Sequence, residues 1–296
     1  MSAIADDGPT KPIEVLFVAH DGFDTLDLLG PLEVFSQAKH DGGKDVKGMK
    51  AFNTTIAAPT QGVKTAQDVT IKADIDLDDA LEDLNDYDIL VIPGGSTEPF
   101  TGDGGEKKQP IPLIKAWADL QRNDPSKERT LFSVCTGSLL LAKAGVLQGL
   151  AATTHPDHYT RLEMLCQEAS VKDTGIRTDV MEERYVVNNA RFDLGEKPED
   201  NPFITSRKPD ARRPSIIQGR KGSESFKQAK RRESLLKRAN MPLGGLRVIT
   251  AGGITCGIDA ALYLVAALVS VESAHEVARV TQYNWQKGVT VEGIDV

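Results

Sequence analysis

The chain has 296 residues, of which 40% are hydrophobic and 26% are charged, a composition typical of a soluble globular protein. This composition excludes a disordered or collagen-like chain. With 35 Lys and Arg against 43 Asp and Glu, the formal net charge is −8, so the molecule as a whole offers no long-range attraction to nucleic acid. We therefore do not expect nucleic acid as a partner.

The sequence predicts no membrane association. The longest apolar stretch, residues 258–271, contains Asp259 and is shorter than the roughly 20 residues that a membrane helix needs. The first twelve residues include Asp6 and Asp7 and lack the apolar core of a secretory signal. We therefore expect a cytoplasmic protein.

Three cysteines, Cys135, Cys166 and Cys256, are too few and too widely spaced for a disulfide framework or a zinc site. His155 and His158 are three residues apart, but no clear third metal ligand accompanies them. The sequence therefore predicts neither a metal nor a cofactor. For Cys166 and Cys256 we expect simple burial in the core.

Strand and helix patterns alternate along the chain. Short apolar runs rich in β-branched residues predict strands, and apolar residues spaced by three or four predict helices. In chain order we expect strand 13–19, helix 26–38, strands 51–58 and 69–71, helix 77–84, strand 87–92, helix 111–121, strand 130–134, helix 136–147, strands 185–188 and 246–250, and helix 257–270. Ser273 and Glu276 have the spacing of a capping box before a last helix. This alternation predicts an α/β fold: a doubly wound, mostly parallel sheet with helices on both faces.

We expect a single domain over residues 11–288, with a surface insertion at about 189–243 where the periodicity disappears and Pro, Gly, Lys and Arg accumulate. The basic stretch 207–238 is compatible with an acidic partner or RNA. We favour a solvated loop, with a helix at 225–238, because charged runs usually face solvent.

Cys135 lies where strand 130–134 turns directly into the next helix, the layout of a nucleophile elbow. The positive end of that helix would stabilise a thiolate and lower the pKa of the thiol from about 8.5. The alternative is an inert cysteine buried in the core.

A nucleophile needs a partner that moves protons, and the loop after the first strand offers three aspartates. Asp27 is the best placed of them, because the carboxyl ends of neighbouring strands converge in a doubly wound sheet. A helix N-cap is the alternative role for Asp27. Glu33, on the helix behind it, is more simply a solvated residue.

The segment Pro93 to Ser96 ends another central strand, and Gly94 and Gly95 would let backbone N–H groups approach a developing anion. His155 follows Cys135 by about one helix and one strand and could return to the same edge of the sheet. A role as a loop or core histidine is the alternative for His155.

Together, five ordered segments resemble the ThiJ/PfpI superfamily, a class I glutamine amidotransferase-like group with a flavodoxin-like sheet, and in particular its isonitrile hydratase-like branch. The segments are residues 26–31 (LDLLGP), 91–95 (VIPGG), 133–138 (SVCTGS), 152–155 (ATTH) and 250–259 (TAGGITCGID).

This resemblance implies roles for residues of the chain. Cys135 would be the nucleophile, Asp27 its acid/base partner, Thr136 a residue lining the site, and the Gly95 N–H a charge-stabilising donor. It also implies a homodimer. The chain has Asp27 where glyoxalase and deglycase relatives commonly have glutamate, and Thr136 where peptidase-like relatives have histidine.

Three functions remain open from the sequence. The first is a cofactor-independent hydratase, in which the thiolate adds to the carbon of an organic isonitrile. The second is a glyoxalase or deglycase acting on methylglyoxal-type dicarbonyls, with His155 as the base. The third is a non-catalytic ligand- or redox-sensing module. The short segment after Trp285 speaks against a regulator with an appended helix-turn-helix domain.

Overall fold

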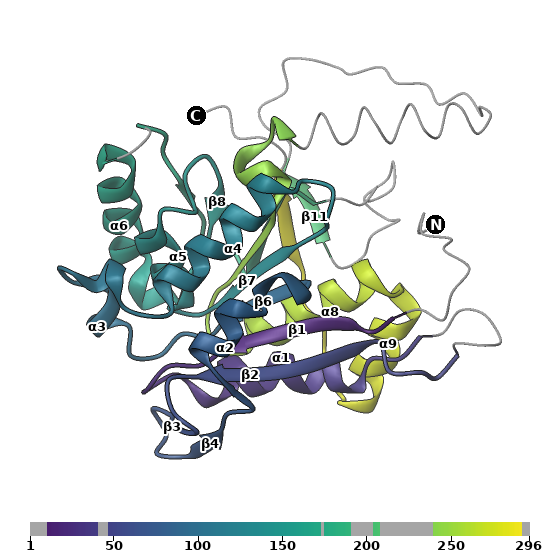
Figure 1. The fold of residues 1–296 in the computed structure, drawn as a ribbon. Helices are drawn as coiled ribbons and strands as arrows, with labels where there is room; N and C mark the ends of the chain where they lie inside the picture. The colour runs from purple at the N-terminus through teal and green to yellow at the C-terminus, as the bar shows by residue number, and fades with distance from the viewer. Residues whose placement is uncertain (1–10, 41–46, 173–174, 191–203, 208–238, 292–296) are drawn as a thin grey trace, which may run out of the picture.

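The computed structural model describes residues 11–40, 47–172, 175–190, 204–207 and 239–291 (Figure 1). Its centre is a nine-stranded sheet in the order β11-β13-β10-β12-β7-β6-β1-β2-β5. Neighbouring strands pair in parallel except for β10 and β12, which are antiparallel. The predicted α/β fold with a doubly wound, flavodoxin-like, mostly parallel sheet is therefore confirmed.

The elements occur along the chain in an alternating order. Their bounds are β1 Ile13–Val18, α1 Thr25–Gln37, β2 Phe52–Ala58, β3 Gly62–Lys64, β4 Thr70–Lys72, β5 Ile75–Asp76, α2 Leu77–Glu82, β6 Ile89–Ile92, α3 Glu98–Thr101, α4 Ile111–Asn123, β7 Thr130–Val134, α5 Gly137–Ala144, β8 Ala151–Ala152, α6 Tyr159–Lys172, β9 Asp179–Val180, β10 Tyr185–Asn188, β11 Ile204–Arg207, β12 Arg247–Ala251, α8 Cys256–Leu268, α9 Val271–Val280 and β13 Gly288–Val291. Short 3-10 turns lie at Leu84–Asp86, Gly105–Lys107, Pro156–His158 and Pro242–Gly245.

The central strands are apolar because both faces of the sheet are covered. Every residue of β6, β7 and β12 is buried. One hydrophobic cluster lies between the sheet and α1, α8 and α9, and a second lies between the sheet and α2, α4, α5 and α6. Figure 1 shows these two helical layers on either side of the strands. A parallel sheet covered in this way presents its carboxyl edge to solvent, where loops can form a site.

Two predicted helix boundaries are wrong. The helix after Cys135 ends at Ala144 rather than continuing to 147, because Gly145, with a φ of 75°, caps it. The last helix begins one turn earlier than the capping-box spacing indicated: Ser270 is its N-cap and accepts from the Ser273 N–H, so Ser273 lies inside the helix.

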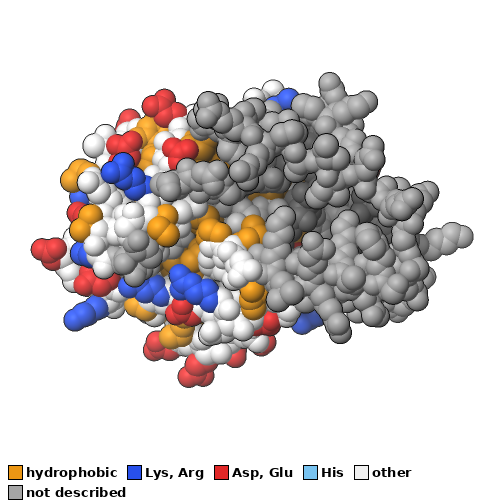
Figure 2. Space-filling view, turned by 90° about the horizontal axis from the view of Figure 1, so that it is seen from above, with side chains coloured by type: hydrophobic (Ala, Val, Ile, Leu, Met, Phe, Trp, Pro, Cys, Tyr) orange, Lys and Arg blue, Asp and Glu red, His pale blue; other side chains and the backbone are white. Residues whose placement is uncertain are grey.

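Most of the predicted insertion at 189–243, including the predicted helix at 225–238, lies outside the described residues. Within it the structure describes β11, which pairs with β13 at the edge of the sheet. On the part of the upper face that Figure 2 draws in colour, basic and acidic side chains are interspersed. No helix in the described part of the chain is long and apolar enough to cross a membrane.

Candidate active site

Cys135 links β7 to α5 in a strained backbone conformation. Its φ of 56° lies in the left-handed region, which non-glycine residues rarely adopt. Its N–H lies 3.0 Å from the carbonyl oxygens of both Ala251 and Gly252, at the end of the neighbouring strand β12. The strand-turn-helix layout expected from the sequence is therefore present. The Cys135 thiol is buried and forms no disulfide.

Asp27 lies in the first turn of α1 and is fully buried. The N-cap of this helix is Asp24, whose side chain accepts from the Leu26 N–H, so the alternative role of Asp27 as the cap is wrong. Asp27 instead points inward, and its Oδ2 accepts from the Gly94 N–H at 3.0 Å. Its Oδ1 is buried without a regular hydrogen bond in the described part of the chain, and the carboxyl interacts with the Cys135 thiol.

Burial controls the protonation of both groups. Burial and, to a smaller extent, the charge of Asp24 raise the pKa of Asp27 to about 8, against the opposing effects of the Gly94 N–H and the Cys135 thiol. Burial also raises the pKa of Cys135 to about 12, assisted by the charge of Asp27. At neutral pH the pair therefore consists of a carboxylic acid and a thiol.

The expected lowering of the thiol pKa by the helix N-terminus is therefore wrong. The N–H and hydroxyl of Thr136 do lie against the sulfur and favour a thiolate. Desolvation of a thiol that is only 6% exposed, next to an acidic side chain, outweighs them.

The backbone N–H groups of Gly94 and Gly95, expected to stabilise charge, both donate to side chains of the site. The Gly95 N–H donates to Thr136 Oγ1 at 2.8 Å, and that hydroxyl donates back to the Gly95 carbonyl oxygen at 3.0 Å. The two glycines thus hold Asp27 and Thr136 in place. A Cβ at Gly94 would lie 2.5 Å from the Thr136 nitrogen, so only glycine fits there.

Ser96 and His155 contact residues other than Cys135 and Asp27. Ser96 is exposed, and its N–H donates to the Gly22 carbonyl oxygen at 2.9 Å. His155 borders the loop at Gly253, but its imidazole accepts from the Asp157 N–H and packs against His158 rather than against Cys135.

Sequence reasoning assigned no role to Thr154 or Ser138. Both are fully buried, and both donate to the carbonyl oxygen of Cys135. Ser138 is three residues from Cys135, so its contact follows from local helix geometry. Thr154 lies within the quoted segment 152–155, but its contact depends on how distant elements pack.

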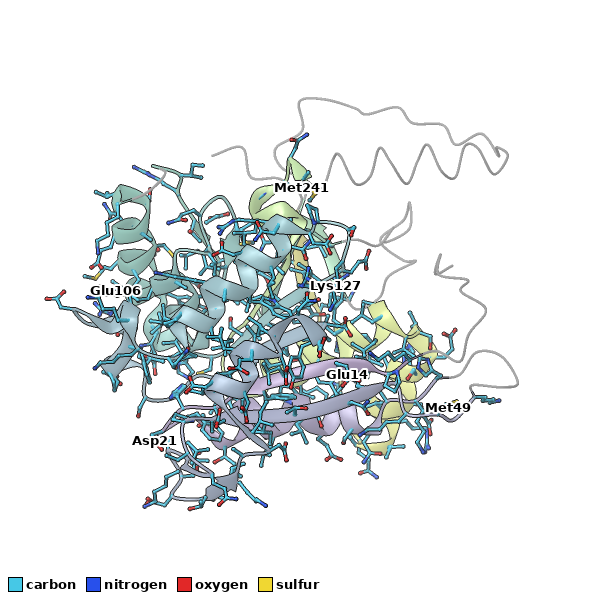
Figure 3. The ribbon with its side chains drawn as sticks, viewed as in Figure 1. Glu14, Asp21, Met49, Glu106, Lys127 and Met241 are labelled. Carbon is cyan, nitrogen blue, oxygen red and sulfur yellow. The ribbon has the colours of Figure 1, made fainter. Side chains whose placement is uncertain are left out.

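A separate cavity of about 310 Å³ lies at the same edge of the sheet, beyond the end of β1. His20, Phe100 and Asp21 are among its lining residues, whereas Cys135 and Asp27 are not. Figure 3 labels Asp21 beyond the carboxyl end of β1 and Glu14 near its amino end, so the two residues mark opposite ends of the strands. Among the described residues, no cluster of three or more His, Cys, Asp or Glu is arranged to hold a metal ion.

Comparison with known proteins gives relatives of several kinds. An uncharacterized protein in the cpoL 5' region of Streptomyces lividans is 32% identical over 155 residues, which are 52% of this chain and 96% of that protein. The isonitrile hydratase of Pseudomonas putida is 36% identical over 96 residues, which are 32% of this chain and 37% of the hydratase. A deglycase of Pyrococcus abyssi is 24% identical over 147 residues, which are 49% of this chain and 73% of the deglycase.

Solved structures confirm the fold. Drosophila melanogaster DJ-1beta superposes with a TM-score of 0.52 at 17% identity, covering 93% of this chain and 100% of that chain. An AraC family transcriptional regulator from Pseudomonas putida gives 0.55 at 14% identity, covering 91% and 100%. The sequence profile of the DJ-1/PfpI family matches residues 13–213, more than half of the chain. The resemblance to ThiJ/PfpI proteins is thus confirmed, and the chain belongs to the DJ-1/PfpI family.

Proposed function

We propose that this protein is a cysteine-dependent hydratase that adds water to the terminal carbon of an organic isonitrile. The observation that carries the proposal is the buried Asp27 carboxyl, which keeps its proton up to a pH of about 8 and lies against the thiol of Cys135. The carbon of an isonitrile must receive both a proton and a nucleophile. A protonated carboxyl beside a thiol supplies both within one site.

In the first step Asp27 delivers its proton to the isonitrile carbon while the Cys135 sulfur bonds to the same carbon. The proton of the thiol passes to the carboxylate as the carbon–sulfur bond forms. The product is a thioimidate on Cys135, and Asp27 is protonated again. The thiol therefore never needs to exist as a free thiolate, which is consistent with the raised pKa of Cys135.

In the second step water adds to the thioimidate carbon. One proton of the water is transferred, through Asp27, to the nitrogen, which leaves a tetrahedral carbon bearing a hydroxyl group. The carbon–sulfur bond then breaks, and the hydroxyl proton returns to the sulfur. An N-substituted formamide and the starting thiol are released, so one water is consumed in each turnover.

The relatives and the site together favour this reaction over the alternative on dicarbonyls. The matched segment of the Pseudomonas putida isonitrile hydratase is 36% identical to this chain, whereas the deglycase match is 24% identical. A glyoxalase would also need a base to move a proton between two carbons. The sequence candidate for that base, His155, directs its contacts to Asp157 and His158.

The test is a parallel turnover assay with a simple alkyl isonitrile and with methylglyoxal, following formamide and lactate. We expect formamide from the wild type, none from Cys135→Ser, and at most a trace from Asp27→Asn. Cys166→Ser is the matched control, because Cys166 is an equally buried thiol in α6. Formation of formamide by Cys135→Ser at the wild-type rate would contradict the proposal. Lactate as the product of the wild type would favour the glyoxalase reaction instead.

A further inference from the structure

The carbonyl oxygen of Cys135 is held by two buried hydroxyl groups. Ser138 Oγ and Thr154 Oγ1 each donate to it at 3.1 Å, and both residues are 0% exposed. Ser138 comes from the first turn of α5, whereas Thr154 comes from the loop that follows β8. Two separate elements thus converge on one peptide group of the candidate nucleophile.

The same peptide group ends in the N–H of Thr136, which lies against the Cys135 sulfur and favours its negative charge. A peptide unit is planar, so hydrogen bonds that fix its carbonyl oxygen also fix the direction of its N–H. Hydrogen bonds accepted by the oxygen also polarise the N–H and strengthen what it donates. The two hydroxyls therefore act on the sulfur through a single peptide plane.

The two hydroxyl groups constrain a residue whose backbone is strained. With a φ of 56°, Cys135 occupies a conformation that persists only where its surroundings enforce it. On its amino side, the N–H faces the carbonyl oxygens of Ala251 and Gly252. On its carboxyl side, Thr154 and Ser138 are the corresponding constraints.

We infer that Thr154 is a positioning residue, assisted by Ser138, that aims the Thr136 N–H at the Cys135 sulfur and so stabilises the negative charge that develops there. The inference rests on the proposed role of Cys135 as the nucleophile. It concerns the reactivity of the thiol itself, so it can be tested without the substrate.

The test compares Thr154→Val with Thr154→Ser, which restores the hydroxyl, and with Thr153→Val. Thr153 is the matched control, because it is equally buried and its hydroxyl donates to the carbonyl oxygen of Glu183 at 3.0 Å instead. The readout is the rate at which iodoacetamide alkylates Cys135, measured by peptide mass spectrometry between pH about 6 and about 10. The pKa of the thiol lies above this range, so the rate at each pH is proportional to the thiolate fraction. Formamide production is measured alongside.

We expect Thr154→Val to lower the alkylation rate roughly three- to tenfold, which is the effect of one hydrogen bond. The plot of rate against pH should be displaced to higher pH. Thr154→Ser should restore both, and Thr153→Val should change neither. An unshifted profile in Thr154→Val, or an equal shift in Thr153→Val, would overturn the inference.

Two further results distinguish a failure of the inference from misfolding of Thr154→Val and from a failure of the proposed function. Ser138→Ala removes the other hydroxyl from the same carbonyl oxygen, so it carries the test if Thr154→Val does not fold, and an unchanged profile there would then refute the inference. If the wild type forms no formamide but the alkylation profile still shifts, the proposed function fails and the inference stands.

Discussion

The carboxyl of Asp27 lies against the thiol of Cys135, and burial raises the pKa of both groups. The two groups therefore keep their protons together at neutral pH. Such a site can transfer the Asp27 proton to a substrate carbon. The carboxylate can then take up the proton of the Cys135 thiol. The proposed reaction needs the protonated form of Asp27, so it predicts an activity that depends on pH in a defined direction.

We expect hydratase activity to be constant below a pH of about 8 and to fall above it, because Asp27 then loses the proton that it must donate. The measurement is the pH dependence of kcat/KM with an alkyl isonitrile. Activity that rises through pH 8 and beyond would show that a deprotonated group limits the reaction and would contradict the acid role of Asp27.

The same carboxyl should make the stability of the fold depend on pH. In the unfolded chain an aspartate releases its proton at about pH 3.9, whereas folded Asp27 retains its proton to about pH 8. Between these values the folded state binds one proton more than the unfolded state. The contribution of Asp27 to the free energy of unfolding therefore declines as pH rises, by at most about 1.4 kcal/mol for each pH unit.

Asp27→Asn removes this titration, so the variant should gain stability relative to the wild type as pH rises from about 5 to about 8. Urea unfolding at several pH values measures the difference. Asp21→Asn, which changes an exposed carboxyl on the preceding loop, controls for the loss of one negative charge. A constant difference between Asp27→Asn and the wild type across this range would show that Asp27 is ionised in the fold.

The sequence predicts the elements that local pattern controls. Strand 130–134 and strand 185–188 coincide with β7 and β10 as predicted, because continuous apolar runs are typical of buried strands. The turn at Cys135 is also found where an apolar strand gives way to a leucine-rich helix. Such patterns reflect only the residues that are neighbours in the sequence.

Features that depend on distant partners were not predicted. The sequence does not show that the Gly95 N–H donates to Thr136, which lies 41 positions along the chain. The thiol pKa was expected to fall, because the sequence reveals a helix N-terminus but not the depth at which the thiol is buried. Nothing in the residues around Thr154 shows that its hydroxyl contacts Cys135, which lies 19 positions earlier in the chain.

Gly94 offers a direct test of how closely the site is packed. A methyl group there would lie 2.5 Å from the Thr136 nitrogen and 2.6 Å from its hydroxyl oxygen, so Gly94→Ala must displace Thr136 or the Gly94 N–H that holds Asp27. We expect a loss of activity of at least about tenfold, because a small displacement of reacting groups is costly.

Gly102→Ala is the matched control, because a Cβ at Gly102 would meet only one atom, the Glu98 carbonyl oxygen at 3.9 Å. Steady-state kinetics and thermal unfolding should be measured for both variants. A Gly94→Ala variant with wild-type kcat and KM would show that the Gly94 to Thr136 contact can relax without disturbing the site.

An ion pair between Arg184 and the buried Asp259 supports the loop on which the Cys135 backbone rests. Arg184 donates Nε to Asp259 Oδ2 at 2.8 Å, and the Gln286 N–H donates to Asp259 Oδ1 at 2.7 Å. The Arg184 carbonyl oxygen accepts from the Gly252 N–H at 2.8 Å, so the residue that anchors the pair also holds the loop next to Cys135. Asp259 thus joins the start of α8 to the residue before β10 and to the segment before β13.

We expect Asp259→Ala to lower the free energy of unfolding by about 2 to 3 kcal/mol, because it leaves Arg184 and the Gln286 N–H without their buried acceptor. The expected loss is at the lower end for a buried pair because the Arg184 side chain is 38% exposed. Urea unfolding measures it, with Glu276→Ala as the control, since Glu276 pairs with Arg279 on an exposed helix face and should change little. If the two variants were equally stable, the Arg184 to Asp259 pair would contribute no more than a surface ion pair, and the loop that supports Cys135 would have to be held by its backbone hydrogen bonds alone.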